Sequence, residues 1–349
     1  MLKKFIVSFI FTLTWSGVWL FSSLSLQAAS QSSSNAACAN LVLAEGNWQS
    51  SVLLTHIDHL ILKEFFHCPV QTVFYSDMMQ ALDDLIAGKI TLIPEFWTNS
   101  YQNKLDVAKA NNQIAQIPLV YVEGGIEGFW LPSYLLAVQP GLNQIDTLKQ
   151  HANLFSQEQG ELPNFYLCPQ SWGCYKTSLQ IFRSHGLDQY FTPVAPPNDL
   201  TMILNISDSF EYKKPWIGYY YNPTSLLSKS RMVMVDLQTD FDEQEWTRCT
   251  IDLDCPDPQK NNFPTIDIST LYHINTLTDP KLIQYFEKRI LTHSEISDLL
   301  VWQEKNEATY HETAQHFYTQ HQAIWQKFVP QWVSFLLLNR SGCSPVFLS

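Results

Sequence analysis

Two cysteines six positions apart enclose a segment whose residue types suit ligand binding, Cys168-Pro169-Gln170-Ser171-Trp172-Gly173-Cys174. A disulfide between them would close a small ring, and because the loop is short it would stabilise the fold by only about 2 kcal/mol. Its main effect would be to hold the backbone. Pro169 and Gly173 favour a tight turn, and Trp172 would project from that turn with little freedom.

A helix is predicted after this ring, because Leu179, Phe182 and Leu187 share one face of a helical pattern. The backbone N–H groups of Gly173 and Cys174 would then lie near a helix N-terminus, where anions are favoured. A fixed indole beside such amides suits a ligand with a cation at one end and a carboxylate at the other. The alternative is a structural disulfide with a packed tryptophan.

The elements that position this ring follow an apparent export signal, because residues 1–28 are predicted to be a secretory signal peptide. Lys3 and Lys4 supply the positive start, residues 5–26 are almost wholly apolar, and a small-residue cleavage site ends at Ala28. The apolar run is long enough to span a bilayer, so an uncleaved anchor is the alternative. We expect cleavage near Ala28.

The composition of the remaining chain is acidic and rich in aromatic residues. Without residues 1–28 it has 321 residues, 19 of them basic and 33 acidic, and a formal charge of −14. This balance argues against nucleic acid or an anionic membrane as the main partner. The length allows two domains with substantial cores. Many of the 11 Trp and 15 Tyr lie near Pro or Gly, which indicates aromatic binding surfaces.

The seven cysteines of an exported chain predict disulfides. Spacing alone does not prove connectivity, but it favours three pairs and one free thiol: Cys168–Cys174, Cys249–Cys255, Cys38–Cys68 and free Cys343. The chain contains neither a CxxC motif nor the Cys/His spacing of a zinc site, so we expect no metal and no cofactor.

Strand and helix patterns alternate along the chain, which predicts an α/β fold. The strand over 90–93 delivers Trp97 just beyond its carboxyl end, where ligands bind in parallel α/β sheets. Glycines in 123–132 predict a hinge and a crossover between domains, and residues 139–150 resemble a linker. The other expected strands are 41–44, 70–75, 117–122, 164–167 and 216–223, and the expected helices are 53–65, 78–87, 282–291 and 294–318.

Enzymatic and metal motifs are weak. His311 and His316 resemble an HExxH pair, but they are five residues apart and would not share a helix face. The chain has no GxSxG or Walker A pattern. Asp252, Asp254 and Asp257 suggest calcium, but neighbouring Cys and Pro residues break the spacing of an EF-hand loop, which favours an exposed acidic loop.

From about Cys38 to Trp332 the chain resembles the periplasmic glycine betaine/proline betaine-binding proteins of ABC transporters. The motifs that carry the resemblance lie in order along the chain, and the Cys168 ring is the most specific. The others are Asn47-Trp48, Pro94-Glu95-Phe96-Trp97, Gly128-Phe129-Trp130-Leu131-Pro132, Lys214-Pro215-Trp216-Ile217-Gly218-Tyr219-Tyr220-Tyr221-Asn222-Pro223, and the Cys249/Cys255 loop running into Pro256-Asp257-Pro258.

The resemblance implies a two-lobed periplasmic binding protein fold of type II-like α/β class, with a central sheet flanked by helices in each lobe and a hinge between them. We expect lobe 1 to comprise 38–121 and 268–332 and lobe 2 to comprise 122–267. No family element matches 333–349, whose role we do not assign. The implied partners are an ABC permease and its ATPase, and the protein would be a periplasmic monomer without enzymatic activity.

The resemblance also implies which residues bind the ligand. Trp97 and Trp172 match two tryptophans that box a quaternary ammonium, and Tyr221 stands where some members carry a third. Gly173 and Cys174 match amides that hold the ligand carboxylate. Tyr101 stands where some members place a histidine for the same purpose; additional candidates are Trp48, Trp130 and Tyr219. A methylated ammonium donates no strong hydrogen bond, so selectivity must come from ring faces, each worth ~1–2 kcal/mol when desolvated.

Three hypotheses remain open. The first is a binding protein for glycine betaine or a similar compound. The second is the same fold with choline, carnitine or a sulfonium osmolyte as ligand, and choline would not need the Gly173 and Cys174 amides. The third is a secreted enzyme, which the sequence disfavours because it lacks a nucleophile and base in any known arrangement.

Overall fold

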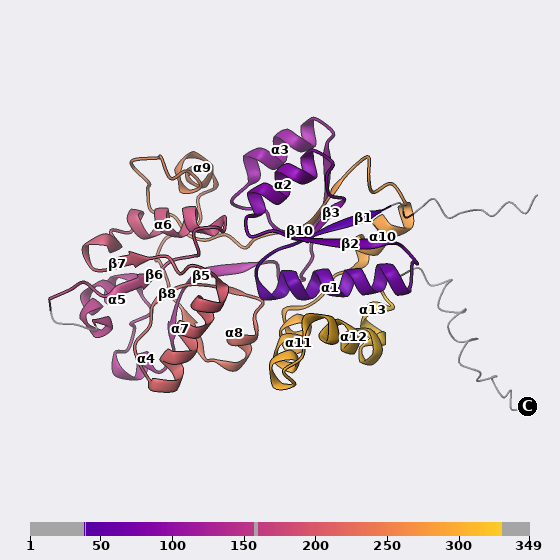
Figure 1. The fold of residues 1–349 in the computed structure, drawn as a ribbon. Helices are drawn as coiled ribbons and strands as arrows, with labels where there is room; N and C mark the ends of the chain where they lie inside the picture. Colours follow the sequence, from indigo (N-terminus) through magenta and orange to yellow (C-terminus); the bar gives the residue numbers. More distant parts are fainter. Residues whose placement is uncertain (1–37, 39, 157–159, 330–349) are drawn as a thin grey trace, which may run out of the picture. The chain divides into compact units, whose positions relative to one another are not determined.

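The computed structural model describes residue 38, residues 40–156 and residues 160–329. This part of the chain forms two five-stranded mixed sheets, each flanked by helices (Figure 1). The strand order is β2-β1-β3-β10-β4 in the first sheet and β7-β6-β8-β5-β9 in the second. The two-lobed α/β fold predicted from the sequence is confirmed. The exact lobe boundaries stay a prediction.

The first sheet is built from β1 (Leu41–Glu45), β2 (Val70–Phe74), β3 (Leu92–Trp97), β4 (Ile114–Ile117) and β10 (Ile268–His273). β1 pairs parallel with β2 and β3, whereas β10 runs antiparallel between β3 and β4. Alternate side chains of β1 point to opposite faces. Leu41 and Leu43 share a core with α1 (Gln49–Glu64), and Ala44 shares a core with α2 (Met78–Ile86). The strand β3 continues through Trp97, beyond its predicted end at 93.

The helices that complete this part of the chain are α3 (Gln102–Ala110), α10 (Pro280–Lys288), α11 (His293–Lys305), α12 (Tyr310–Gln320) and α13 (Gln322–Trp325). The prediction of a single helix over 294–318 is wrong, because the helix is interrupted between α11 and α12. Glu307 has a left-handed φ of 49°, and Thr309 and Glu312 form a capping box that begins α12. Such a box satisfies the free N–H groups of a new helix, so two helices replace one.

The second sheet is built from β5 (Ile126–Pro132), β6 (Asn164–Tyr166), β7 (Thr192–Val194), β8 (Gly218–Asn222) and β9 (Met232–Met234). β6 runs parallel to β7 and β8, and β5 runs antiparallel to β8 and β9. The α-helices of this part are α4 (Leu135–Val138), α5 (Ile145–Gln150), α6 (Cys174–Ser184), α7 (Asp199–Tyr212), α8 (Ser225–Lys229) and α9 (Glu243–Glu245). Short 3₁₀ turns span Ala152–Phe155 and Leu187–Gln189, and a π-helical turn spans Trp246–Thr250.

Two local predictions are corrected. The strand expected over 117–122 ends at Ile117, because Leu119 adopts a left-handed φ of 62° that strand pairing does not allow. The segment 139–150 is not a linker. It contains α5, and Leu142, Ile145 and Leu148 are fully or almost fully buried, so their spacing of three residues marks a packed turn.

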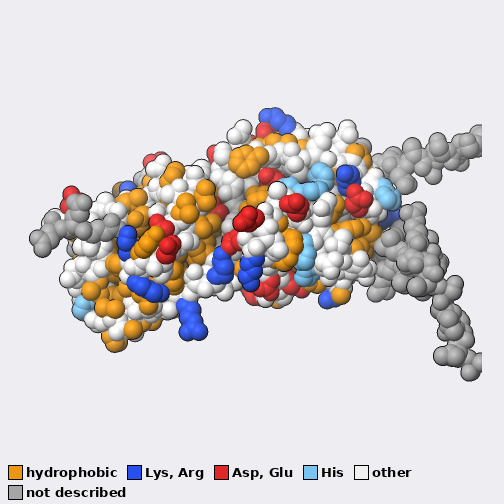
Figure 2. Space-filling model, turned by 60° about the horizontal axis from the view of Figure 1, so that its bottom comes forward, with side chains coloured by type: hydrophobic (Ala, Val, Ile, Leu, Met, Phe, Trp, Pro, Cys, Tyr) orange, Lys and Arg blue, Asp and Glu red, His pale blue; other side chains and the backbone are white. Residues whose placement is uncertain are grey.

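The three predicted disulfides are confirmed: Cys38–Cys68, Cys168–Cys174 and Cys249–Cys255. Residues 1–28, Cys343 and 333–349 lie outside the described residues. Among the helices of the described part, none combines the length and apolar character needed to cross a membrane. On the face drawn in Figure 2, acidic and basic side chains are interspersed.

Candidate functional site

A cavity of about 50 Å³ brings together residues from both sheets. It is lined by Trp48, Met78, Phe96, Trp97, Asn99, Ser100, Tyr101, Glu127, Trp172, Gly173, Cys174, Tyr219 and Tyr221. All six residues that the sequence assigns to ligand binding are in this lining, together with Trp48 and Tyr219. Trp130 is not, since its indole N–H donates to the carbonyl oxygen of Tyr220 at 3.1 Å on a neighbouring strand.

The aromatic rings of the lining meet edge to face. The Trp97 and Tyr221 ring centroids are 5.8 Å apart at 88°, and those of Trp172 and Tyr221 are 5.6 Å apart at 79°. Trp48 continues the row, with its ring 5.8 Å from that of Trp172. This geometry is favourable for aromatic pairs. It holds aromatic side chains from β3, β8, the Cys168–Cys174 disulfide ring and the start of α1 around one space.

A buried carboxylate that the sequence analysis did not single out positions two of these rings. Glu95 Oε1 accepts hydrogen bonds from the indole N–H groups of Trp48 at 2.7 Å and Trp97 at 3.0 Å, and from Ser50 Oγ at 2.9 Å. Its Oε2 accepts from the Tyr121 hydroxyl at 2.7 Å. An acid inside the otherwise apolar strand β3 is the signal that could have identified it, because a buried carboxylate needs such partners.

The close approach of Trp97 to the backbone depends on a glycine. A Cβ atom at Gly125 would lie 2.7 Å from Cζ3 of Trp97, which is nearer than real Cβ contacts. The glycine-rich segment that the sequence assigns to a hinge therefore also makes room for this indole.

The ring closed by Cys168 and Cys174 leads directly into α6, whose first residue is Cys174 and whose N-cap is Gly173. The Tyr101 ring lies against Gly173, where a Cβ atom would be 2.7 Å from the tyrosine hydroxyl. Burial raises the pKa of Tyr101. The two residues whose amides are expected to attract an anion thus line the cavity with a tyrosine hydroxyl beside them.

A second buried acid, Glu127 on β5, lines the cavity and was also missed by sequence reasoning. Its side chain is 3% exposed, and it accepts hydrogen bonds from Asn99 Nδ2 and from the Tyr219 hydroxyl, both at 2.7 Å. Burial raises the pKa of Glu127 to about 7. The signal is the same as for Glu95, an acid within an otherwise apolar strand, but the glycines at 124, 125 and 128 suggested a hinge there instead.

Direct hydrogen bonds join the two sheets' segments around the cavity. Besides the Asn99–Glu127 bond, Trp172 Nε1 donates to Asn47 Oδ1 at 2.7 Å. Asp199, at the start of α7, accepts from the Tyr221 hydroxyl at 3.3 Å. Burial raises the pKa of Asp199 to about 7.

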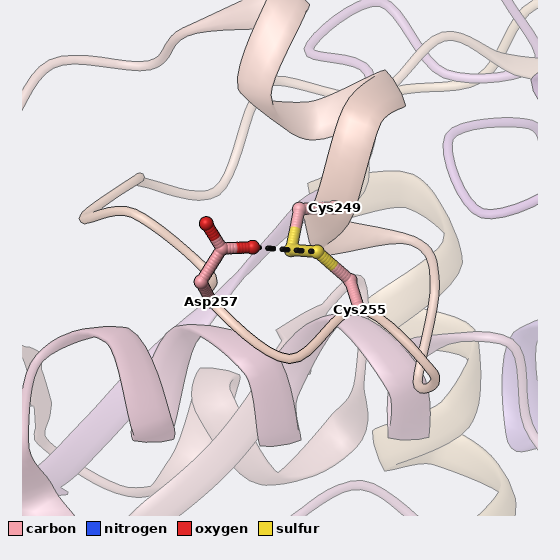
Figure 3. Close-up of side chains that lie close together, drawn as sticks. All are labelled: Cys249, Cys255 and Asp257. Atoms are coloured by element: carbon pink, nitrogen blue, oxygen red, sulfur yellow. Dashed lines mark hydrogen bonds between the residues drawn. A yellow bond between two sulfur atoms is a disulfide. The ribbon is translucent and has the colours of Figure 1, made fainter.

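The motifs that suggested enzymes or metals lie elsewhere. His311 contacts Gln315 on the surface of α12, whereas the His316 ring stacks on Trp302 at 3.9 Å, so the two histidines do not act together. Cys249, Cys255 and Asp257 lie close together (Figure 3). The two sulfurs are bonded to each other, and a disulfide offers no thiolate to a metal.

Comparison with protein-family models matches residues 39–320 to the substrate-binding domain of ABC-type glycine betaine transport systems. A search of curated protein sequences finds no match. The matched residues are well over half of the chain and include every residue that lines the cavity.

Solved structures share the fold. The glycine betaine/L-proline-binding protein ProX from Borrelia burgdorferi is 16% identical, with a TM-score of 0.66 over 85% of this chain and 99% of its own. Lactococcal OpuAC, closed on glycine betaine, is 16% identical, with a TM-score of 0.64 over 83% and 99%. An ABC-transporter choline-binding protein in complex with choline is 10% identical, with a TM-score of 0.62 over 85% and 92%.

Proposed function

Because the chain belongs to the family of substrate-binding domains of ABC-type glycine betaine transport systems, we propose that its cavity captures a small quaternary ammonium compound. Glycine betaine is the candidate that the family match suggests. Choline, carnitine and sulfonium osmolytes carry a comparable cation and are the alternatives. The observation that carries the proposal is the set of three rings, Trp97, Trp172 and Tyr221, that meet around the cavity.

The physical basis of the proposal is the cation–π interaction. A trimethylammonium group presents methyl surface and spread positive charge, which the faces of Trp and Tyr attract by ~1–2 kcal/mol each when desolvated. Three such contacts support micromolar affinity after the cost of ordering the ligand and closing the protein. The amides of Gly173 and Cys174, with the Tyr101 hydroxyl, would contact the other end of the ligand.

The ligand would be held between two lobes that close on it. We assign 38–121 and 268–332 to one lobe and 122–267 to the other. Trp97 then belongs to the first lobe, and Trp172 and Tyr221 belong to the second, so the aromatic box is complete only in the closed form. The Trp172–Asn47 and Asn99–Glu127 hydrogen bonds support this assignment, since each would form only on closure.

In the cell, the protein would act as a periplasmic monomer, exported with a signal peptide cleaved near Ala28. It would deliver its ligand to an ABC permease driven by an ATPase and would not change the ligand chemically. Recovery of the added ligand unchanged after incubation, measured by NMR, is the expected result. Stoichiometric conversion or turnover would favour a secreted enzyme instead.

The test of the ligand class is a methylation series measured by calorimetry and tryptophan fluorescence. Glycine betaine, dimethylglycine, sarcosine and glycine form one series, and choline, dimethylethanolamine and ethanolamine form another. Affinity should fall with each lost methyl in both, because the box loses contact area and gains an N–H that it cannot satisfy. Equal affinity for a trimethylated and an unmethylated member of either series would overturn the aromatic box.

A further inference from the structure

The charged side chains that line the cavity are of one sign, negative. Among the described residues that line it, Glu127 is the single carboxylate, and the lining includes no Lys, Arg or His. The other ionisable side chains in the lining are tyrosines, and burial raises their pKa values. A ligand cation therefore finds a carboxylate in the cavity wall, whereas a ligand carboxylate finds no cationic side chain there.

The position of Glu127 follows from strand pairing. Glu127 on β5 is directly opposite Tyr221 on β8, so the two side chains leave the sheet on the same face. Tyr219 lies two residues along β8 on this face and donates its hydroxyl to Glu127. With Asn99 donating to the other oxygen, the carboxylate is held beside the ring that is proposed to contact the ligand cation.

Among the described residues, the part of the cavity formed by Gly173 and Cys174 offers an anion no cationic side chain. Gly173, whose N–H would attract a ligand carboxylate, lies against the ring and hydroxyl of Tyr101. Asn99, which is bonded to Glu127, and Ser100 also line the cavity and are neutral. A ligand hydroxyl would lie beside the Tyr101 hydroxyl without adding a charge, while a ligand carboxylate would share a cavity of about 50 Å³ with the Glu127 carboxylate.

We propose that Glu127 is a specificity-determining residue that makes this site prefer quaternary ammonium alcohols of the choline type over zwitterionic betaines. The inference rests on the proposed function and names the ligand class for the same cavity. Glu127 attracts the ammonium of both ligand types and repels the carboxylate of the betaine only. Its neighbours Asn99 and Tyr219 position it for this role from two different elements.

The same arrangement predicts a pH dependence of binding. Burial raises the pKa of Glu127 to about 7, and a bound cation favours its ionised form. Choline affinity is then highest above pH 7 and falls as Glu127 takes up a proton below it. The other titratable groups near this wall are Tyr219 and Tyr221 on β8, Glu95 on β3 and Asp199 on α7.

The experiment measures the dissociation constants of choline and glycine betaine by calorimetry at pH 8 and pH 6, for the wild type, Glu127→Gln and Asp146→Asn. Asp146 has a side chain that is 72% exposed, so this control removes a carboxylate charge from the surface. The wild type and the control should bind choline at least about tenfold more tightly than glycine betaine at pH 8. Glu127→Gln should reduce this ratio at least about tenfold and weaken the pH dependence of choline binding, leaving only the part that Asp199 contributes.

Two results separate the possible failures. If the wild type binds glycine betaine as tightly as choline or more tightly at pH 8, the role of Glu127 is overturned while the proposed function stands. If the wild type binds neither ligand, the proposed function itself fails. The wild-type ratio and its pH dependence decide the matter even if Glu127→Gln does not fold, and circular dichroism melting curves report whether it does.

Discussion

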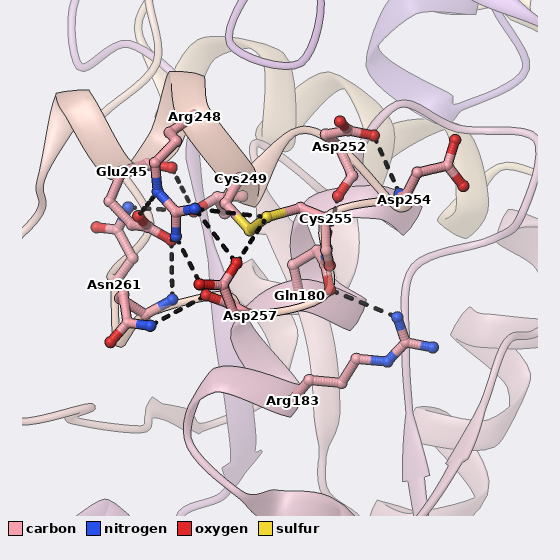
Figure 4. Close-up of a disulfide and its surroundings, with 12 residues drawn as sticks. Gln180, Arg183, Glu245, Arg248, Cys249, Asp252, Asp254, Cys255, Asp257 and Asn261 are labelled. Atoms are coloured by element: carbon pink, nitrogen blue, oxygen red, sulfur yellow. Dashed lines mark hydrogen bonds and ion pairs between the residues drawn. A yellow bond between two sulfur atoms is a disulfide. The ribbon is translucent and has the colours of Figure 1, made fainter.

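Two disulfide rings with identical spacing serve different parts of this molecule. Cys168–Cys174 and Cys249–Cys255 each span a sequence separation of 6. The first ring lines the cavity through Gly173 and Cys174. The second closes a loop that contains Asp252 and Asp254, and Arg248, just before this loop, pairs with Glu245 at 2.7 Å (Figure 4). Equal cysteine spacing therefore predicts disulfide rings of equal size, but it does not predict that both line the cavity.

Helix α6 connects the two rings. It begins at Cys174, and one and a half turns later its buried Gln180 side chain donates to the carbonyl oxygens of Asp252 and Cys255 in the second ring. A tryptophan within the first ring and one just before the second each have an indole N–H that reaches a segment next to the first sheet. Trp172 donates to Asn47 Oδ1, and Trp246 donates to the Asn99 carbonyl at 3.0 Å. The second disulfide ring therefore supports α6, and the first disulfide ring presents the first turn of the same helix to the cavity.

The largest expected effect is on stability, from Trp246→Ala beside the second ring. Trp246 is 4% exposed, so its truncation leaves a cavity in the core and a carbonyl without its donor. We expect the free energy of unfolding to fall by about 3–5 kcal/mol in urea titrations. Once folded, the variant should keep the order of ligand affinities. A loss below 1 kcal/mol would show that the second ring is not part of the supporting core.

The next effect is on affinity, from Trp172→Ala in the first ring. Removal of one ring face should weaken ligand binding by about 2 kcal/mol, or roughly thirtyfold, measured by calorimetry. Its loss of stability without ligand should be smaller than that of Trp246→Ala, which is the matched control. If Trp172→Ala binds normally but is the less stable variant, the roles of the two rings are reversed.

The smallest effect, and the one that compares the rings directly, comes from opening each of them with paired Cys→Ser substitutions. Both variants should lose about 2 kcal/mol of stability, because the closed loops have the same length. Opening Cys168–Cys174 should in addition weaken binding roughly tenfold, since Trp172 and the Gly173 amide lose their fixed positions. Opening Cys249–Cys255 should change affinity by less than about threefold. Equal affinity losses would contradict the division of roles.

Much of the fold could be predicted from the sequence because its signals are local. Apolar alternation and helical periodicity located most strands and helices, and close cysteine spacing predicted two of the three disulfides. The errors also have local causes that periodicity does not register. Leu119, which has a left-handed φ, ends the strand expected over 117–122, and the Thr309–Glu312 capping box divides the helix expected over 294–318.

The candidate site, too, could be predicted from the sequence only in part. A place just after a strand indicated Trp97, the Cys168 ring indicated Trp172, and the family resemblance implied Tyr221; the structure brings all three to one cavity. Trp130, in an equally suggestive motif, faces another strand instead. A residue in a strand alternates between two faces, and only the packed sheet decides which face borders the cavity.

By itself, the sequence determined the α/β order, the two short disulfide rings and the supply of aromatic rings, because these depend on residue type and short spacing. Only the tertiary structure decided that Glu95 holds Trp48 and Trp97, and that Glu127 borders the cavity. The environment of a carboxylate depends on residues far away in the chain, such as Tyr219, 92 positions beyond Glu127. Burial and charge, which set ligand preference, therefore arise from long-range packing that no local pattern records.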